Sequence, residues 1–116
     1  MTGARLTTHV LDTARGRPAE GVAVSLARVM GDRRVRLAEA VTNADGRTDA
    51  PLLSGDALTE GVYELTFAAG DYHRAQGASG TLFLDLIPVR FGYAGTGHYH
   101  VPLLLSPFGY STYRGS

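Results

Sequence analysis

The chain contains no cysteine and no lysine. Without cysteine, no disulfide framework, thiolate zinc site or cysteine nucleophile can form. All 11 basic residues are arginine and they balance 11 acidic residues, so the net charge gives no reason to expect nucleic acid or an anionic membrane as a partner. These absences exclude disulfide-stapled folds and chemistry at a thiol.

Long apolar runs are also absent. No segment approaches the ~20 apolar residues that a membrane span requires. Residues 1–5 lead straight into a strand-like segment and lack the apolar region of a secretory signal. We therefore expect no membrane association and a cytoplasmic location. The length of 116 residues predicts one domain, residues 1–116, with a single core.

Apolar and polar residues alternate with a period of two along most of the chain, and 15 glycines divide it into short segments. This pattern predicts strands over residues 6–11, 22–29, 35–41, 61–68, 83–91, 98–105 and 110–114. A short helix is expected over residues 71–76, capped by Asp71 and followed by Gly77. About seven or eight strands, without a parallel crossover pattern, predict an all-β fold: an antiparallel β-sandwich with one short helix.

His9 lies in the middle of the first predicted strand. Alternation places Leu6, Thr8, Val10 and Asp12 on one face, and Thr7, His9 and Leu11 on the other. A lone histidine in a strand is usually a surface residue or a hydrogen-bonded core residue. His9 therefore carries no functional meaning by itself.

His98 and His100 lie two residues apart in a strand, so their side chains share a face. Such a pair is a common half-site for zinc, but a catalytic zinc needs a third protein ligand. Only His9, His73 or a carboxylate could supply that ligand. The spacing alone is weak evidence for a metal site.

Arg47 directly follows the turn sequence Asn-Ala-Asp-Gly, where a solvated loop residue is the simplest interpretation. Tyr113 and Arg114 could likewise be ordinary edge-strand residues. No glycine-rich phosphate loop, no G-x-S-x-G elbow and no paired carboxylates compete with these candidates. Each of these signals is weak when taken alone.

Three segments together carry a resemblance: "LTTHVLDTARGRPAEGV", "TNADGRTDAPLL" and "HYHVPLLLSPFGYSTYRGS". In this order, and over nearly the whole chain, they closely resemble the transthyretin-like 5-hydroxyisourate hydrolases. The resemblance implies a transthyretin-like sandwich and a homotetramer, a dimer of dimers with active sites at the subunit interface. Transthyretin hormone carriers share this fold, so a carrier of a small aromatic ligand without catalysis is the alternative.

The resemblance also implies a set of site residues and no cofactor or metal. The catalytic residues would be His9, Arg47, His100 and Ser116, and the substrate-binding residues would be His9, Arg47, Tyr113 and Arg114. The sequence does not establish what His98 does, and we expect a structural role or one that supports the neighbouring site residues. Two departures from the family pattern, Asp85-Leu86 in place of a frequent Pro-Glu and a shorter "YAGTG" turn, would affect strand-edge geometry.

The implied reaction is hydrolysis of 5-hydroxyisourate to 2-oxo-4-hydroxy-4-carboxy-5-ureidoimidazoline, a step of urate degradation toward allantoin. An activated carbonyl of this kind needs a placed water, a base near pKa 7 and positive charge at the developing oxyanion. A histidine with an ordinary pKa of about 6.5 suits the base, and an arginine suits the oxyanion. Which of His9 and His100 is the base stays open.

The predicted sandwich restricts where this site can form. Apolar side chains fill the space between two sheets, so His9, Arg47 and His100 can meet only on an outer face or its rim. Ligand sites usually bury most of their ligand. We therefore expect another copy of the chain, related by a two-fold axis, to cover this face.

Overall fold

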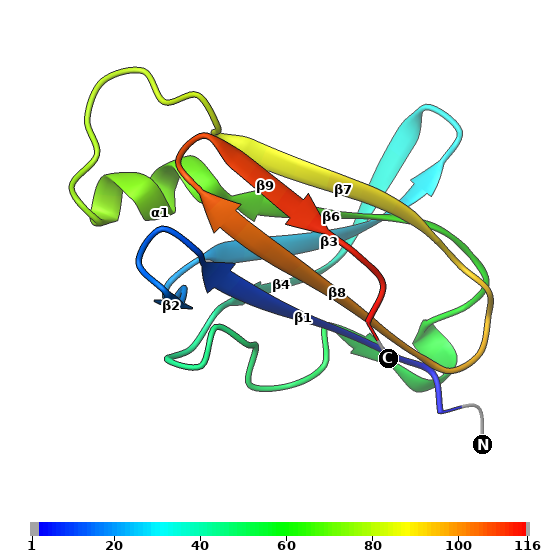
Figure 1. Ribbon diagram of the computed structural model, residues 1–116. Helices are drawn as coiled ribbons and strands as arrows, with labels where there is room; N and C mark the ends of the chain where they lie inside the picture. Colours follow the sequence, from blue (N-terminus) through cyan, green and yellow to red (C-terminus); the bar gives the residue numbers. More distant parts are fainter. Residues whose placement is uncertain (1–2, 116) are drawn as a thin grey trace.

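The computed structural model describes residues 3–115 as two packed β-sheets with one short helix at their edge (Figure 1). The strands of the first sheet are β1 (Arg5–Asp12), β2 (Arg17–Pro18), β5 (Leu53–Ser54), β8 (His98–Ser106) and β9 (Gly109–Thr112). Those of the second are β3 (Ala23–Met30), β4 (Arg33–Val41), β6 (Gly61–Ala68) and β7 (Leu86–Tyr93). A 3-10 turn, η1 (Gly55–Ala57), and the helix α1 (Ala69–Ala75) complete the fold.

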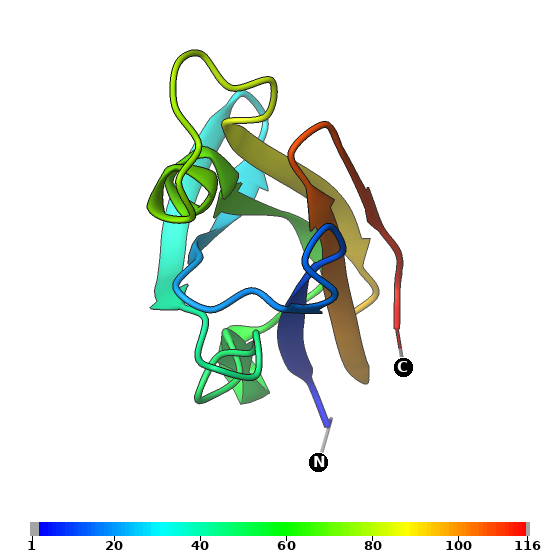
Figure 2. The same cartoon turned by 60° about the vertical axis from the view of Figure 1, so that its left-hand side comes forward.

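The strand order is β2-β1-β8-β9 in one sheet, with β5 also pairing β1, and β4-β3-β6-β7 in the other. Figure 2, turned from the first view, shows the two layers facing each other. The predicted all-β sandwich with one short helix is therefore confirmed. Among the described strands, β7 and β9 each have a single neighbour, as do β2, β4 and β5, so each leaves one backbone edge free within the chain.

One pairing differs from the expected antiparallel pattern. β1 and β8 run parallel, with Arg5 opposite His98 and Thr7 opposite His100. A parallel pair between the first strand and one near the end of the chain cannot be read from local turns, because nearly the whole chain connects them. This register places the polar residues of both strands next to one another.

Three predicted boundaries need correction. Residues 83–85 are not strand; the Asp85 carbonyl instead accepts a hydrogen bond from the Gly70 amide at the start of α1 (3.0 Å), and β7 begins at Leu86. Asp71 does not cap the helix, which begins at Ala69. Its carboxylate lies in the first turn and pairs with Arg74 at 3.2 Å. The last strand ends at Thr112 and does not reach residue 114.

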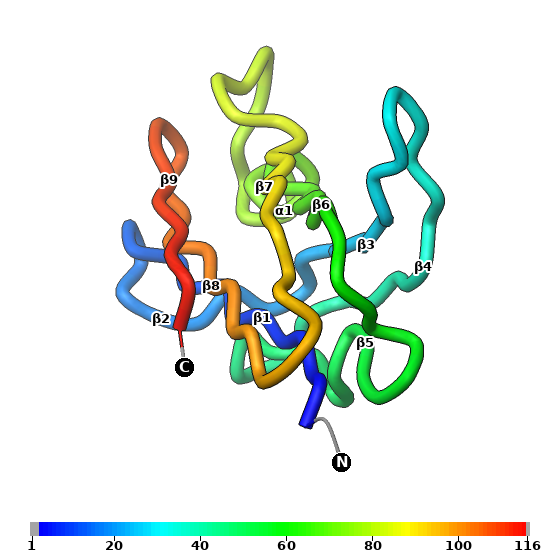
Figure 3. The backbone as a smooth tube through the Cα atoms, turned by 90° about the vertical axis from the view of Figure 1, so that its right-hand side faces the viewer, coloured from blue at the N-terminus to red at the C-terminus, as the bar shows by residue number. Residues whose placement is uncertain are grey.

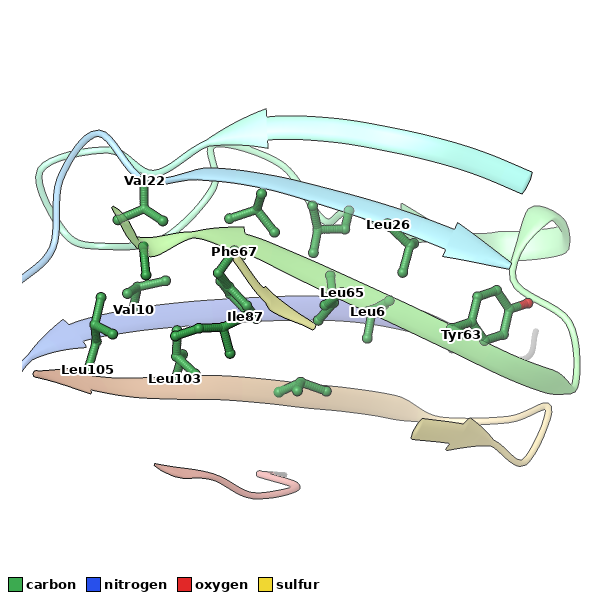
Figure 4. Packing of buried hydrophobic residues seen from close by; sticks show 14 of the residues in the cluster. Leu6, Val10, Val22, Leu26, Tyr63, Leu65, Phe67, Ile87, Leu103 and Leu105 are labelled. Carbon is green, nitrogen blue, oxygen red and sulfur yellow. The ribbon is translucent and has the colours of Figure 1, made fainter. Parts of the chain in front are cut away.

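The core lies between the sheets, where alternate residues of each long strand point inward (Figure 4). Leu6 and Val10 of β1 are fully buried, and Leu65 and Phe67 of β6 face them from the opposite sheet. Each such side chain stabilises the fold by about 1.5–3 kcal/mol on burial. The alternation that buries these residues leaves Thr7 and His9 on the outer face of β1.

The last strand lies at the edge of its sheet, next to β8 (Figure 3). The chain beyond it stays beside β8, because the Gly115 amide donates a hydrogen bond to the His100 carbonyl at 2.6 Å. Within residues 3–115, no helix has the length and apolar character needed to cross a membrane.

Candidate active site

Polar side chains gather on the outer face of the sheet where β1 and β8 lie side by side. Arg5, Thr7 and His9 come from β1, and His98 and His100 come from β8. The ring centres of His9 and His100 are 6.4 Å apart, and those of His98 and His100 are 6.2 Å apart. The parallel register therefore assembles three imidazoles on one outer face of the sheet.

Arg47 reaches this face through the turn at residues 43–46. The Asn43 carboxamide oxygen accepts hydrogen bonds from the backbone amides of Asp45 (2.9 Å) and Arg47 (3.2 Å), which holds the turn closed. The Gly46 carbonyl then accepts a hydrogen bond from the Val10 amide at 2.8 Å, so the turn docks on β1. Arg47 consequently lies directly opposite His9 in an isolated antiparallel bridge.

Gly46 is required for this docking. Its φ of +75° lies in the left-handed region, and a Cβ at this position would run into the Val10 carbonyl oxygen. The same Cβ would lie 3.3 Å from the His9 ring. Only glycine lets the turn approach β1 this closely.

Hydrogen bonds orient the three imidazoles. His9 Nε2 lies 2.9 Å from the Asp45 carbonyl oxygen. The Thr7 hydroxyl lies between the other two rings, 2.7 Å from His98 Nε2 and 2.8 Å from His100 Nδ1. The far side of the His98 ring meets Arg5, whose Nη2 lies 3.3 Å from His98 Nδ1.

Burial and neighbouring positive charge keep two of the histidines neutral. Desolvation is the main cause that lowers the pKa of His100 below its usual value of 6.5, and Arg47, His9 and His98 lower it further. Desolvation also lowers the pKa of His98, with a smaller contribution from Arg5. Both imidazoles are therefore available in their neutral form at and below neutral pH.

An open hollow of about 370 Å³ lies over this face. His98, His100, Thr7 and Arg5 form its floor, and the segment from Arg47 to Pro51 forms its rim. A hollow of this size can hold a small planar molecule, with guanidinium, hydroxyl and imidazole groups as its hydrogen-bonding partners.

The C-terminal candidates are placed elsewhere in the single chain. The Arg114 guanidinium lies over the Tyr99 ring, 4.0 Å from its centre, on the opposite side of β8 from His98 and His100. Tyr113 and Arg114 line a separate hollow of about 220 Å³ between β7 and β9. Ser116 lies outside the described residues. The structure thus brings His9, Arg47 and His100 together, and it does not place Tyr113 or Arg114 beside them within one chain.

The described residues 3–115 contain no group of three or more His, Asp or Glu side chains positioned to hold a metal ion. Thr7 bonds the two facing nitrogens of His98 and His100. His73, considered above as a third ligand, is buried on α1 beside Tyr72.

Sequence reasoning missed two members of this face, Arg5 and Thr7. The alternation that puts His9 on the outer face of β1 also puts these residues there. The signal was therefore present. A threonine and an arginine on a solvent-facing strand are too common to stand out until their partners on β8 are known.

The fold and this face define a two-sheet sandwich with a histidine- and arginine-lined site on one outer surface. Residues 6–115 match the model of the HIUase/Transthyretin family, and the chain belongs to that family. The 5-hydroxyisourate hydrolase of Mesorhizobium japonicum is 60% identical over 116 residues, covering 98% of this chain and 94% of that protein.

Two solved structures show the range of the family. That of (S)-allantoin synthase superimposes with a TM-score of 0.90 at 47% identity, over 99% of this chain; the chain spans 45% of that longer protein. Sea bream transthyretin in complex with thyroxine superimposes with a TM-score of 0.87 at 32% identity, over 96% of this chain and 94% of that one. Enzymes and a hormone-binding protein thus share this fold, and the site chemistry must separate them.

Proposed function

We propose that this protein is a 5-hydroxyisourate hydrolase, which opens the six-membered ring of its substrate by attack of water. The observation that carries the proposal is the meeting of His9, Arg47 and His100 on one sheet face. The two rings lie 6.4 Å apart, and Arg47 is paired to His9 through the backbone. The 60% identical relative bears the name of this activity.

His9 is the general base. A carbonyl oxygen can only accept a hydrogen bond, so the contact with Asp45 puts the proton of neutral His9 on Nε2. Its Nδ1 then carries a free lone pair, which can take a proton from water. The oxygen of that water forms the new bond to the ring carbonyl carbon.

Arg47 and His100 stabilise the charge that this attack creates. The carbonyl oxygen becomes an oxyanion, and a guanidinium at the rim of the hollow offers fixed positive charge and several N–H donors. The intermediate then collapses: the ring C–N bond breaks, and the nitrogen takes up the proton that water gave to His9. The collapse leaves a carboxylic acid where the carbonyl stood, and this acid loses its remaining proton to solvent. The carboxylate agrees with 2-oxo-4-hydroxy-4-carboxy-5-ureidoimidazoline, and urate degradation continues from there toward allantoin.

The functional unit is a single domain that assembles as a homotetramer, a dimer of dimers. Two features of the single chain support this. The hollow over His100 is open, so a second copy is needed to enclose the substrate. Strands β7 and β9 each leave an edge free for pairing with a copy of the same strand. In such an assembly Tyr113 and Arg114 complete the substrate-binding site and Ser116 joins the catalytic residues, the roles that the family resemblance implies for them.

A carrier function is the alternative, since sea bream transthyretin was solved with thyroxine. A carrier for an aromatic hormone needs an apolar channel, whereas here three imidazoles and two guanidinium groups line the face. The hydrolase interpretation uses these groups and the carrier interpretation does not.

The test is to incubate the protein with freshly generated 5-hydroxyisourate and to follow its ultraviolet absorbance. We expect decay well above the spontaneous rate, unchanged by a chelator. A chelator-sensitive rate would indicate a metal-dependent hydrolase. Binding of thyroxine without any acceleration of the decay would indicate a carrier.

A further inference from the structure

The residues around His100 form a continuous chain of hydrogen bonds along the sheet face. It runs from Arg5 Nη2 to His98 Nδ1 (3.3 Å), from His98 Nε2 to the Thr7 hydroxyl (2.7 Å), and from that hydroxyl to His100 Nδ1 (2.8 Å). The register of β1 and β8 creates it, since Arg5 stands opposite His98 and Thr7 opposite His100. The catalytic steps proposed above use neither Thr7 nor His98 nor Arg5.

The chemistry of the donors allows the hydrogen bonds of this series to be donated in one direction only, from Arg5 toward His100. A guanidinium can only donate, so His98 Nδ1 must accept from Arg5, and the proton of neutral His98 lies on Nε2. That Nε2–H donates to the Thr7 oxygen. A hydroxyl has one proton, and among the described residues the acceptor left for it is His100 Nδ1. Neutral His100 must then carry its own proton on Nε2.

The reverse direction is unfavourable for an equally simple reason. If Thr7 donated to His98 Nε2, the proton of neutral His98 would lie on Nδ1 and would face the guanidinium of Arg5. Two donors would then meet at 3.3 Å with no acceptor between them. Arg5 lies at one end of this series of hydrogen bonds and His100 at the other, so Arg5 determines the tautomer of His100.

We propose that Arg5, His98 and Thr7 are positioning residues that hold His100 as its Nε2–H tautomer, so that this imidazole donates a hydrogen bond to the reacting carbonyl oxygen. The proposal rests on the hydrolase function proposed above. The two histidines then have different roles: His9 offers an unprotonated nitrogen as the base, and His100 offers an N–H as a hydrogen-bond donor. It also gives His98 a defined role in the site.

The experiment is ¹⁵N NMR of the histidine side chains of the substrate-free protein, well above the histidine pKa values, combined with steady-state kinetics. In the unsubstituted protein we expect the Nε2–H tautomer for both His98 and His100. Thr7→Val removes the hydroxyl at nearly constant shape, and Arg5→Met removes the donor that gives the chain its direction. We expect either change to give His100 a mixture of tautomers and to lower kcat roughly five- to tenfold, the value of one hydrogen bond, with a smaller change in KM.

Thr7→Ser is the matched control, because it keeps the hydroxyl and should preserve both the tautomer and the rate. Thermal unfolding of each variant separates this effect from loss of fold. A Nδ1–H tautomer of His100 in the unsubstituted protein would overturn the proposal, and so would an unchanged tautomer and kcat in Thr7→Val. The NMR result needs no substrate. Absence of any hydrolysis by the unsubstituted protein would reject the proposed function instead, while the tautomers would still decide whether the hydrogen-bond chain has the stated direction.

Discussion

His9 and Arg47 face each other across an isolated antiparallel bridge, in which a turn from elsewhere in the chain pairs with the middle of β1. This backbone contact places the arginine at the rim of the hollow before any substrate arrives. A charge that is already in position needs no reorganisation when the oxyanion forms, and this makes such groups effective in catalysis.

Gly46→Ala tests this contact. The new methyl group would need a left-handed backbone and would collide with the Val10 carbonyl oxygen. We expect the free energy of unfolding in urea to fall by about 1–3 kcal/mol and hydrolysis to fall with it, because the turn and Arg47 must shift. Gly31→Ala is the matched control, since Gly31 also has a positive φ (+66°) but nothing lies within 4 Å of its added Cβ. Equal loss of activity in both variants would contradict the role of the docked turn.

Alanine in place of His9, His100 or Arg47 should leave a folded protein with hydrolysis lowered about 10²-fold or more, the range for loss of a general acid or base. None of the three side chains belongs to the buried core, so stability should change little. Arg36→Ala serves as control. It removes an exposed arginine that pairs with Glu39 on the other sheet, and it should retain full activity. A near-normal rate in any of the three site variants would remove that residue from the mechanism.

The pH dependence follows from the lowered pKa values. Because burial and Arg47 disfavour the charged form of His100, its neutral form persists below pH 6.5. Arg47→Met removes a positive charge and should raise the pKa of His100 toward 6.5, which NMR titration of the His100 ring measures. A pKa that falls or stays unchanged in this variant would show that the guanidinium does not act on His100.

Stability should respond to pH with a definite sign. In the unfolded chain these histidines take up protons near pH 6.5, but in the folded chain the pKa values of His98 and His100 are lower. As the pH falls from 6.5, the unfolded state therefore binds more protons, and the free energy of unfolding decreases until the folded pKa values are passed. A double variant, His98→Gln with His100→Gln, should show a flatter profile in urea unfolding between pH 7 and 5.

Much of this site could be predicted from the sequence, and the missing part has a physical cause. Alternation correctly placed His9 on the outer face of β1, and β6 was predicted with its observed bounds, Gly61–Ala68. The parallel register of β1 with β8 could not be predicted, because it depends on a contact between distant parts of the chain. Without that register, Thr7 has no visible connection to His98 and His100.

The predictions of the helix cap and of the start of β7 were wrong for a related reason. Local propensity favours Asp71 as a cap and Phe83 as a strand residue, but the hydrogen bond from Gly70 to Asp85 ties the two segments together. Tertiary contacts here outweigh local preference. The cytoplasmic location also stays a prediction.

Assembly should control activity. We expect the protein to sediment as a tetramer and the rate per chain to fall when it dissociates on dilution, because the open face over His100 loses its cover. Placing a charged residue at a free sheet edge, as in Ser111→Asp on β9, should weaken assembly while leaving the fold intact. A fully active monomer at the assay concentration would contradict the proposed tetramer.

The end of the chain gives the last prediction. Gly115 bonds the His100 backbone, and a Cβ on Gly115 would lie 3.0 Å from the His100 ring. Gly115→Ala should therefore displace that ring and lower hydrolysis. Deletion of residues 113–116 removes the Arg114 contact with Tyr99, worth about 0.5–1 kcal/mol, and no residue of the buried core.

We accordingly expect the deletion, or a bulky C-terminal tag, to lower hydrolysis sharply while thermal unfolding changes little. Arg114→Met measures the part of this loss that is due to Arg114 alone. It loses the stacking on Tyr99 but keeps the hydrogen bond of Gly115 to His100, so we expect it to lower hydrolysis less than the deletion does. A deletion variant with full activity would show that the last four residues are a passive end of the chain.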